Sequence, residues 1–225
     1  MPPPSPPRDS QRSRVYRAET PVAGGRLPTL PDCAGFMDHV VGSLWWASRF
    51  PEHGLAGVPR LRPGNGARQA FYREDPGHPT ITLPRRYRTT GVVLHELAHW
   101  ALRDAHDLPN HGRTFTRLLL DATIEFGGGA RAERLEASYQ EHRVHVGKPA
   151  RLGSDGRWDY EWEERLRLGR DRWLEVRHGD DELARGVLTS RQHATVHLVD
   201  GKTEHRIPER TIWRVTPVKS RRRRG

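Results

Sequence analysis

The sequence has few residues that would cross-link a fold or hold it in a membrane. Cys33 is its one cysteine, which excludes an intramolecular disulfide and a cysteine-based zinc ribbon. No stretch reaches the ~18 consecutive apolar residues that a membrane helix needs. The first ten residues, MPPPSPPRDS, contain no apolar segment of the kind that a secretory signal requires. We therefore expect a cytoplasmic protein that has no membrane partner.

Basic residues outnumber acidic ones by 38 to 28, and much of the excess lies toward the ends of the chain. Residues 1–14 consist mainly of Pro, Ser and Arg, and this composition predicts a disordered tail. Residues 218–225 form a second, basic tail that contains the run Arg221–Arg224. Such tails neutralise phosphate groups without reading the bases, so they predict at most weak, non-specific contact with nucleic acid.

The middle of the chain has the pattern of an α+β domain over residues 15–145. Apolar residues recur at helical spacing in four segments, which are residues 32–50, 90–105, 114–126 and 130–142. Two short strand-like runs, 68–73 and 80–83, lie between the first two helices, after a loop rich in Gly and Pro at 54–66. We therefore expect helices packed on a small sheet.

From about residue 144 the pattern changes from helical to alternating, which predicts a second, all-β domain over residues 148–217. Asp155-Gly156 and Asp200-Gly201 are typical hairpin turns. Five or six short strands are expected, around residues 158–163, 173–177, 185–189, 194–199, 202–207 and 211–216. Short strands joined by tight turns are typical of a small antiparallel barrel. The predicted fold class is thus α+β, with a barrel-like accessory domain.

Three aromatic residues mark the first of these strands. Trp158, Tyr160 and Trp162 alternate with acidic residues, so one face of the strand is aromatic and the other acidic. We expect the aromatic face to pack in the core of the barrel. The alternatives are a stacking platform for single-stranded nucleic acid, which the acidic face disfavours, and a docking surface for a protein partner.

The strongest functional signal is the HExxH motif of residues 95–99, which lies in the second predicted helix. Four residues advance a helix by slightly more than one turn, so His95 and His99 share a face and can bind one zinc ion. Glu96 lies about 100° round the helix, where it can reach a water molecule on the metal. We therefore expect a Zn²⁺ site in which Glu96 is the catalytic general base.

A catalytic zinc ion takes three protein ligands and a water molecule, so the site needs a third ligand. His111 follows Pro109-Asn110, a turn that lets the chain fold back, and it is the expected ligand. His106 is too far along the helix, because seven residues beyond His99 correspond to about 10 Å of rise. Glu125, on the following helix, is the alternative if the site uses a carboxylate.

These residues resemble the SprT-like zinc metallopeptidases, whose pattern is HExxH, a variable loop and His-Gly-x-x-aromatic. The matching segments are HELAHW at residues 95–100 and HGRTF at residues 111–115. A closer resemblance is to a family of uncharacterised actinobacterial metallohydrolases, which begin with a stretch similar to Arg8–Tyr16. The resemblance covers roughly residues 8–145. It implies a zincin-like fold, three zinc ligands and one catalytic acid/base, which are His95, His99, His111 and Glu96.

Residues near the motif are candidates for binding the substrate. In zincin folds an edge strand beside the metal binds extended peptides by backbone pairing, which makes Ile81, Thr82 and Leu83 candidates. The same run is equally well an ordinary sheet strand. Three tyrosines are candidates for donating a hydrogen bond to an oxyanion, and the sequence does not choose among Tyr72, Tyr87 and Tyr139.

The motif and the resemblance together predict a zinc-dependent metallohydrolase, an enzyme whose expected substrate is a peptide or a protein. One alternative keeps the metal but hydrolyses a small amide or ester. Another is a nucleic-acid-binding adaptor that uses the basic tails and holds a structural metal. An open fourth ligand position would argue against a purely structural metal. The sequence predicts no particular oligomeric state.

Overall fold

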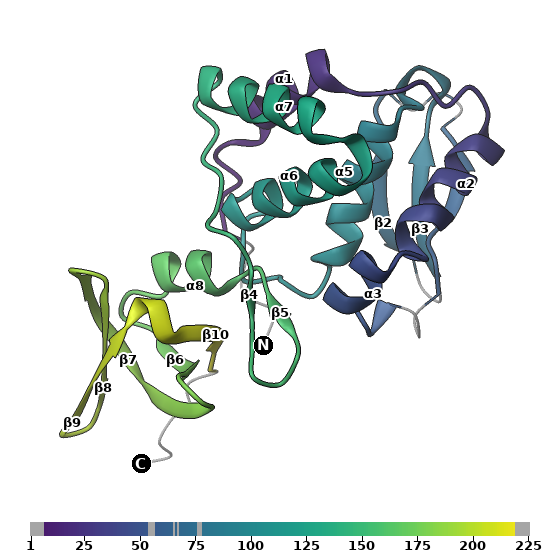
Figure 1. Ribbon diagram of the computed structural model, residues 1–225. Coiled ribbons are helices and arrows are strands. Elements are labelled where there is room, and N and C mark those ends of the chain that lie inside the picture. The colour runs from purple at the N-terminus through teal and green to yellow at the C-terminus, as the bar shows by residue number, and fades with distance from the viewer. Residues whose placement is uncertain (1–6, 54–56, 65, 67, 76–77, 219–225) are drawn as a thin grey trace. The chain divides into compact units, whose positions relative to one another are not determined.

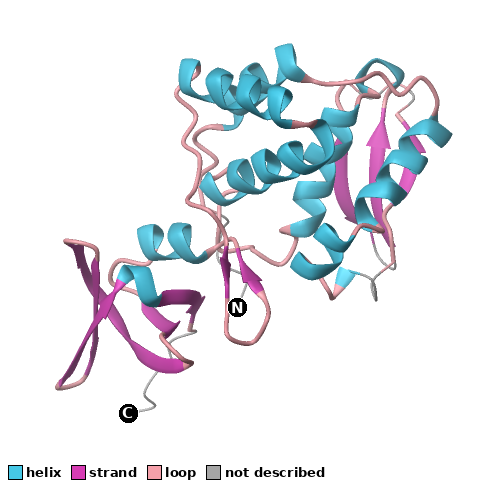
Figure 2. Cartoon of the chain, viewed as in Figure 1, coloured by secondary structure: helices cyan, strands magenta, loops and turns pink. Residues whose placement is uncertain are grey.

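The computed structural model describes residues 7–53, 57–64, 66, 68–75 and 78–218. The chain divides into two compact units, Met1–Gly147 and Lys148–Gly225, at the point where the sequence pattern changes from helical to alternating (Figure 1). The first unit combines helices with a small sheet, and the second consists mainly of strands (Figure 2). The fold class is therefore α+β.

The first unit opens with a helix that the sequence pattern did not predict. Helix α1, Arg12–Glu19, continues into the 3₁₀ turn η1, Thr20–Val22, and packs against α7, Gly129–Glu141. The Oγ of Ser138 on α7 donates a hydrogen bond of 2.8 Å to the carbonyl oxygen of Ala18. This bond holds the end of α1 against α7.

The predicted disordered tail of residues 1–14 is wrong for its second part. Residues 12–14 form the first turn of α1, and the Gln11 side chain is buried. Composition misled here because buried polar contacts, rather than apolar burial, hold this stretch. Residues 1–6 and 219–225, which include most of the predicted basic tail, lie outside the described residues.

The single helix predicted over residues 32–50 is in fact two helices, α2, Leu30–Val41, and α3, Leu44–Arg49. A capping box begins α2: Oγ1 of Thr29 accepts a hydrogen bond of 3.2 Å from the backbone N–H of Asp32, whose carboxylate accepts one from Thr29. Gly42 ends α2, and Ser43 caps α3.

Three further helices form the body of the first unit, and all three were predicted. They are α5, Thr90–Ala101, α6, Arg113–Gly127, and α7. Thr89 caps α5 by accepting a hydrogen bond of 3.3 Å from the backbone N–H of Val92. The apolar faces of α5 and α6 meet in the core, where four side chains are at most 1% exposed: Leu94, Leu97, Phe115 and Leu118.

The sheet of the first unit has three strands in the order β1-β3-β2. They are β1, Arg60–Pro63, β2, Phe71–Asp75, and β3, His78–Leu83. Strand β1 was missed, because the predicted loop over 54–66 reads as Gly- and Pro-rich. It pairs with β3 in parallel, whereas β2 pairs with β3 antiparallel. Strand β3 is therefore central, and β2 contacts α5.

The second unit contains a five-stranded antiparallel sheet in the order β10-β6-β7-β8-β9. Its strands are β6, Trp173–His178, β7, Glu182–Gln192, β8, Thr195–Asp200, β9, Thr203–Pro208, and β10, Ile212–Pro217. The predicted strand segments of this sheet are present. The predicted barrel is wrong, because in the described part of the unit β9 and β10 are open edges that do not pair with each other.

The predicted strand over residues 158–163 is also wrong. Only Trp158–Asp159 is extended, as β5, which pairs with β4, Arg151–Leu152. Oδ1 of Asp159 accepts a hydrogen bond of 2.7 Å from the backbone N–H of Glu161, and this turn leads into helix α8, Trp162–Leu168. An alternating pattern cannot reveal such a turn, because it depends on one side chain bonding to the backbone.

The expectation that the aromatic residues of this region pack in the core is confirmed for Tyr160 and Trp162, whereas Trp158 is only half-buried. The predicted acidic face is wrong, because Asp159 is buried as well. Trp162 is 1% exposed, and its indole N–H donates a hydrogen bond of 3.1 Å to the carbonyl oxygen of Pro149. Tyr160 is also buried. Trp162 packs with the inner face of the five-stranded sheet, so it cannot serve as an exposed stacking platform.

Ion pairs to one buried carboxylate support the same unit. Glu209 lies in the 3₁₀ turn η3, Glu209–Thr211, and its side chain is 9% exposed. Its carboxylate accepts hydrogen bonds from Lys148 and from Nε of Arg191, the latter at 2.8 Å. None of the helices in the described ranges is long and apolar enough to cross a membrane.

Candidate metal centre

Helix α5 places the two histidines of the HExxH motif one turn apart. The Nε2 atoms of His95 and His99 are 3.2 Å apart. Both rings rest on the ring of Phe115 from α6, at centroid distances of 4.9 and 4.6 Å. The helix therefore presents two imidazole nitrogens at a spacing that one metal ion can bridge.

His111 joins this pair from the loop between α5 and α6. The backbone N–H of Gly112 bonds to the carbonyl oxygen of Pro109 at 2.9 Å and turns the chain back toward α5. One ligand atom from each of His95, His99 and His111 lies within 4.8 Å of the others. Nε2 of His111 is buried and has no hydrogen-bond partner among the described residues. Such an unpartnered atom is costly, and it fits a zinc ligand.

Two other candidate ligands lie outside this group. Glu125 is exposed on α6. His106 lines a cleft that His99 and His111 also line, but it does not come within reach of the three imidazoles. In the described part of the chain, the three histidines are the one group of at least three His, Cys, Asp or Glu residues close enough to share an ion. The structure thus places His111, the expected third ligand, beside the motif, and it places the alternative, Glu125, outside the group.

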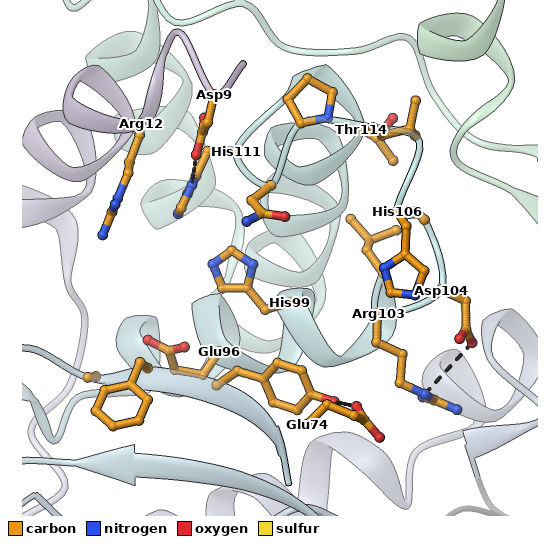
Figure 3. A pocket seen from close by; sticks show the side chains of 18 of the residues that line it. Asp9, Arg12, Glu74, Glu96, His99, Arg103, Asp104, His106, His111 and Thr114 are labelled. Carbon is orange, nitrogen blue, oxygen red and sulfur yellow. Dashed lines mark hydrogen bonds and ion pairs between the residues drawn. The ribbon is translucent and has the colours of Figure 1, made fainter. Parts of the chain in front are cut away.

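Two carboxylates from the beginning of the chain hold the outer nitrogens of two of these histidines. Oε2 of Glu19, the last residue of α1, lies 2.7 Å from Nδ1 of His95. Oδ2 of Asp9 lies 2.7 Å from Nδ1 of His111. Figure 3 shows Asp9 beside His111 at the wall of the cleft. The two Nδ1 atoms face carboxylates, so the Nε2 atoms are left for a ligand.

The charges of the site follow from burial and from these contacts. Burial lowers the pKa of His95, but the Glu19 carboxylate outweighs it, so the pKa is raised. Burial lowers the pKa of His99 well below its ordinary value, and His95 and His111 add to the effect. Burial also lowers the pKa of His111, although Asp9 opposes it. A neutral imidazole is the form that binds a metal.

Glu96 is a buried carboxyl group at the same site, and it is 4% exposed. Burial raises its pKa to about 7, although the neighbouring His95 and the backbone N–H of Tyr72 on β2 oppose the rise. A general base works best when its pKa lies near the working pH. Glu96 therefore has the burial and the acidity expected of a proton acceptor.

A cleft of about 510 Å³ opens over these residues. Its walls come from the N-terminal segment, from β2, from α5 and from the loop that carries His111, and Asp9, Arg12, Glu96 and His99 all line it (Figure 3). A small molecule or a segment of extended chain can therefore reach Glu96 and the exposed side of His99.

Tyr16 of α1 also borders the cleft, and the sequence offered no reason to select it. Its ring stacks on His95 with a centroid distance of 5.3 Å and an interplanar angle of 24°, and it meets the edge of His111 at 5.1 Å. Burial raises the pKa of Tyr16, and a hydrogen bond with Arg12 partly opposes the rise. Its hydroxyl group is thus protonated at neutral pH and can donate.

The three tyrosines considered from the sequence are engaged elsewhere. The hydroxyl group of Tyr139 donates to Glu19 at 3.3 Å, and that of Tyr87 donates to the carbonyl oxygen of Arg68 at 2.9 Å. The hydroxyl group of Tyr72, which borders the cleft, donates to Glu74. Tyr16 is accordingly the stronger candidate for donating a hydrogen bond to an oxyanion.

The prediction that Ile81, Thr82 and Leu83 form an edge strand that binds substrate is wrong. Ile81 and Leu83 are fully buried, and Thr82 shares their strand β3, which is paired on both sides by β1 and β2. A strand with two partners has no free edge for a peptide. Strand β2 is the strand beside the cleft, and in the described residues it pairs with β3 alone.

Asp9, Tyr16 and Glu19 are the site residues that the residue patterns missed. No local motif identifies them, because each acts on a histidine about 76 to 102 positions away. The one sequence signal near them is the resemblance of the Arg8–Tyr16 stretch to the beginning of the actinobacterial metallohydrolases.

Comparison of the chain with protein-family models, with curated proteins and with solved structures found no match. The resemblance to SprT-like metallopeptidases therefore stays a prediction.

Proposed function

We propose that the protein is a zinc-dependent metallohydrolase that cleaves peptide bonds. One observation carries the proposal: one nitrogen from each of three imidazole groups lies within 4.8 Å of the others, and the buried carboxyl group of Glu96 comes from the helix that carries two of them. This is the donor set of a catalytic zinc site, which takes three protein ligands and keeps one position for water or substrate.

Zinc bound by His95, His99 and His111 would supply Lewis acidity, which polarises a carbonyl group and makes water a better nucleophile. Glu96 accepts the proton of the attacking water and returns it to the departing amine. Tyr16, supported by Arg12, donates a hydrogen bond to the oxygen on which negative charge develops.

A peptide substrate is favoured by the position of β2. Its free edge lies along the cleft beside Glu96, and such an edge can pair with an extended backbone. A helix with an HExxH motif packed beside a sheet edge is the arrangement of a zincin-like domain, and we assign the first unit to that architecture. A small amide or ester is the alternative substrate, since it needs the metal and Glu96 but not the strand.

The test combines metal content with hydrolysis. Elemental mass spectrometry of the purified wild type should find about one zinc per chain, and His111→Ala should lose most of it. Glu96→Gln should keep its zinc and lose about 10²- to 10⁴-fold in turnover of a peptide library. Glu125→Gln, an exposed acidic residue, is the matched control and should match the wild type in both measurements.

Two outcomes would overturn the proposal. A wild type that takes up no metal, even when zinc is offered, removes the site. Undiminished hydrolysis by Glu96→Gln, in a preparation free of other hydrolases, removes the mechanism. Hydrolysis of small amides without any hydrolysis of peptides would move the assignment to the alternative substrate.

A further inference from the structure

We propose that the segment Asp9–Glu19 is part of the metal centre, with Asp9 and Glu19 as positioning residues that fix the imidazoles of His111 and His95. The inference rests on the proposed zinc site, but it concerns residues outside the HExxH pattern. It assigns a function to a segment whose first part, residues 9–14, has a composition that predicts disorder.

The contact geometry carries the first step. Each carboxylate lies 2.7 Å from an Nδ1 atom, and the two histidine side chains are only 4% and 5% exposed. An ionised carboxylate can only accept a hydrogen bond, so Nδ1 must be the donor in both pairs. The proton on Nδ1 leaves the lone pair on Nε2, which is the atom turned toward the shared centre in both residues.

The second step is that one of the two carboxylates, that of Glu19, is itself held in place. The other oxygen of Glu19 accepts a hydrogen bond of 3.3 Å from the Tyr139 hydroxyl group, and α1 is joined to α7 through Ser138. Glu19 is therefore fixed from two directions by groups other than the histidine that it orients.

Gln11 fixes the other end of the segment. Its side-chain N–H groups donate to the carbonyl oxygens of His111 at 2.8 Å and His145 at 3.2 Å, and its oxygen accepts from the backbone N–H of His145 at 3.0 Å. This buried amide holds the loop of His111 next to Asp9. The segment thus orients both the ring and the backbone of that ligand.

Zinc affinity tests the inference. Competition with a chromophoric chelator should show that Asp9→Asn and Glu19→Gln each bind zinc about 10- to 100-fold more weakly than the wild type. Asp9→Glu and Glu19→Asp, which keep a carboxylate, should recover part of the loss. Arg17→Gln is the matched control, because Arg17 is exposed on α1 and bonds to the carbonyl oxygen of Ser13, so its affinity should not change.

A second measurement separates positioning from folding. In the metal-free protein, an Nδ1–H proton held by a carboxylate should give a downfield signal in proton NMR, and there should be one for each pair. Asp9→Asn should move only the signal of His111, and Glu19→Gln only that of His95. Loss of both signals in either single variant would indicate general disruption and would overturn separate positioning.

The outcomes distinguish this inference from the function on which it rests. A wild type that binds zinc, with both variants binding equally tightly, overturns the inference and leaves the proposed metallohydrolase intact. A wild type without zinc affinity overturns both.

Discussion

Nε2 of His99 lies 3.2 Å from Nε2 of His95, one turn earlier on the same helix. Nδ1 of His95 donates to Glu19, so its Nε2 carries a lone pair that points at the His99 ring. Two such nitrogens face each other favourably when a cation or a proton lies between them. A metal ion bound here would therefore add to the stability of the unit as well as supply chemistry.

Zinc should therefore raise the thermal stability of the first unit. At a free zinc concentration about 1,000 times the dissociation constant, binding adds about 4 kcal/mol to the free energy of unfolding. For a chain of this size that corresponds to roughly 8 to 16 °C in Tm. Differential scanning calorimetry with and without zinc measures it, and His99→Ala is the control that should lose the shift. An equal shift in His99→Ala would contradict a site at this position.

Removal of the Tyr16 hydroxyl group should slow catalysis without releasing the metal. Tyr16→Phe keeps the ring stacked on His95, so zinc affinity should be unchanged. Loss of one donor to an oxyanion costs about 10²- to 10³-fold in kcat. Steady-state kinetics on the best peptide substrate measures this. Tyr87→Phe, whose hydroxyl group bonds to Arg68, should keep full activity; an unchanged kcat in Tyr16→Phe would assign the oxyanion elsewhere.

Backbone methylation of the substrate should report pairing with β2. A strand edge bonds to alternate residues of its partner, so N-methyl groups at alternate positions of a peptide should each lower kcat/KM by about tenfold or more. Methyl groups at the intervening positions point away from β2 and serve as the control. A uniform effect along the peptide would show that the substrate does not bind as a strand.

The second unit should lose stability in acid because of Glu209. Burial opposes ionisation of this carboxyl group, but hydrogen bonds from Arg191 and Lys148 prevail and lower its pKa from 4.5 to about 2. A lowered pKa contributes stability that is complete above pH 4.5 and is lost as the pH falls toward 2.

Glu209→Gln isolates this contribution. At neutral pH the variant should be less stable than the wild type, and the difference should shrink as the pH falls from 4.5 toward 2. The indole N–H signal of Trp162 reports on this unit alone during denaturant unfolding at each pH. A stability difference that stays constant across that range would assign the effect to packing rather than to charge.

The elements that local patterns predicted correctly are those whose determinants are local. Helix α5 follows from a capping threonine and an apolar period, and its motif places His95 and His99 together wherever the helix packs. The hairpin of β8 and β9 follows from Asp200-Gly201, where Gly201 has a φ of 59°. In these cases a few neighbouring residues determine the backbone.

The features that were missed depend on distant partners. Helix α1 has little apolar content, and its position comes from contacts with α7 and with the histidines. Strand β1 exists because β3 offers it an edge, and no alternation marks it in the sequence. The choice of β3 as the edge strand failed for the same reason, because strand order is a property of the whole sheet.

The bonds of Asp9 and Gln11 to His111 and His145 impose an order on biosynthesis. Asp9 is synthesised about a hundred residues before His111, whose imidazole it orients. The separation between Gln11 and its partner His145 is longer still. A nascent chain that contains only the HExxH helix lacks the third histidine, and one that ends at His111 lacks the clasp that holds its loop. A metal ion held as we propose would therefore bind with full affinity only after translation has passed the end of α7, so metal loading would follow folding of the entire first unit.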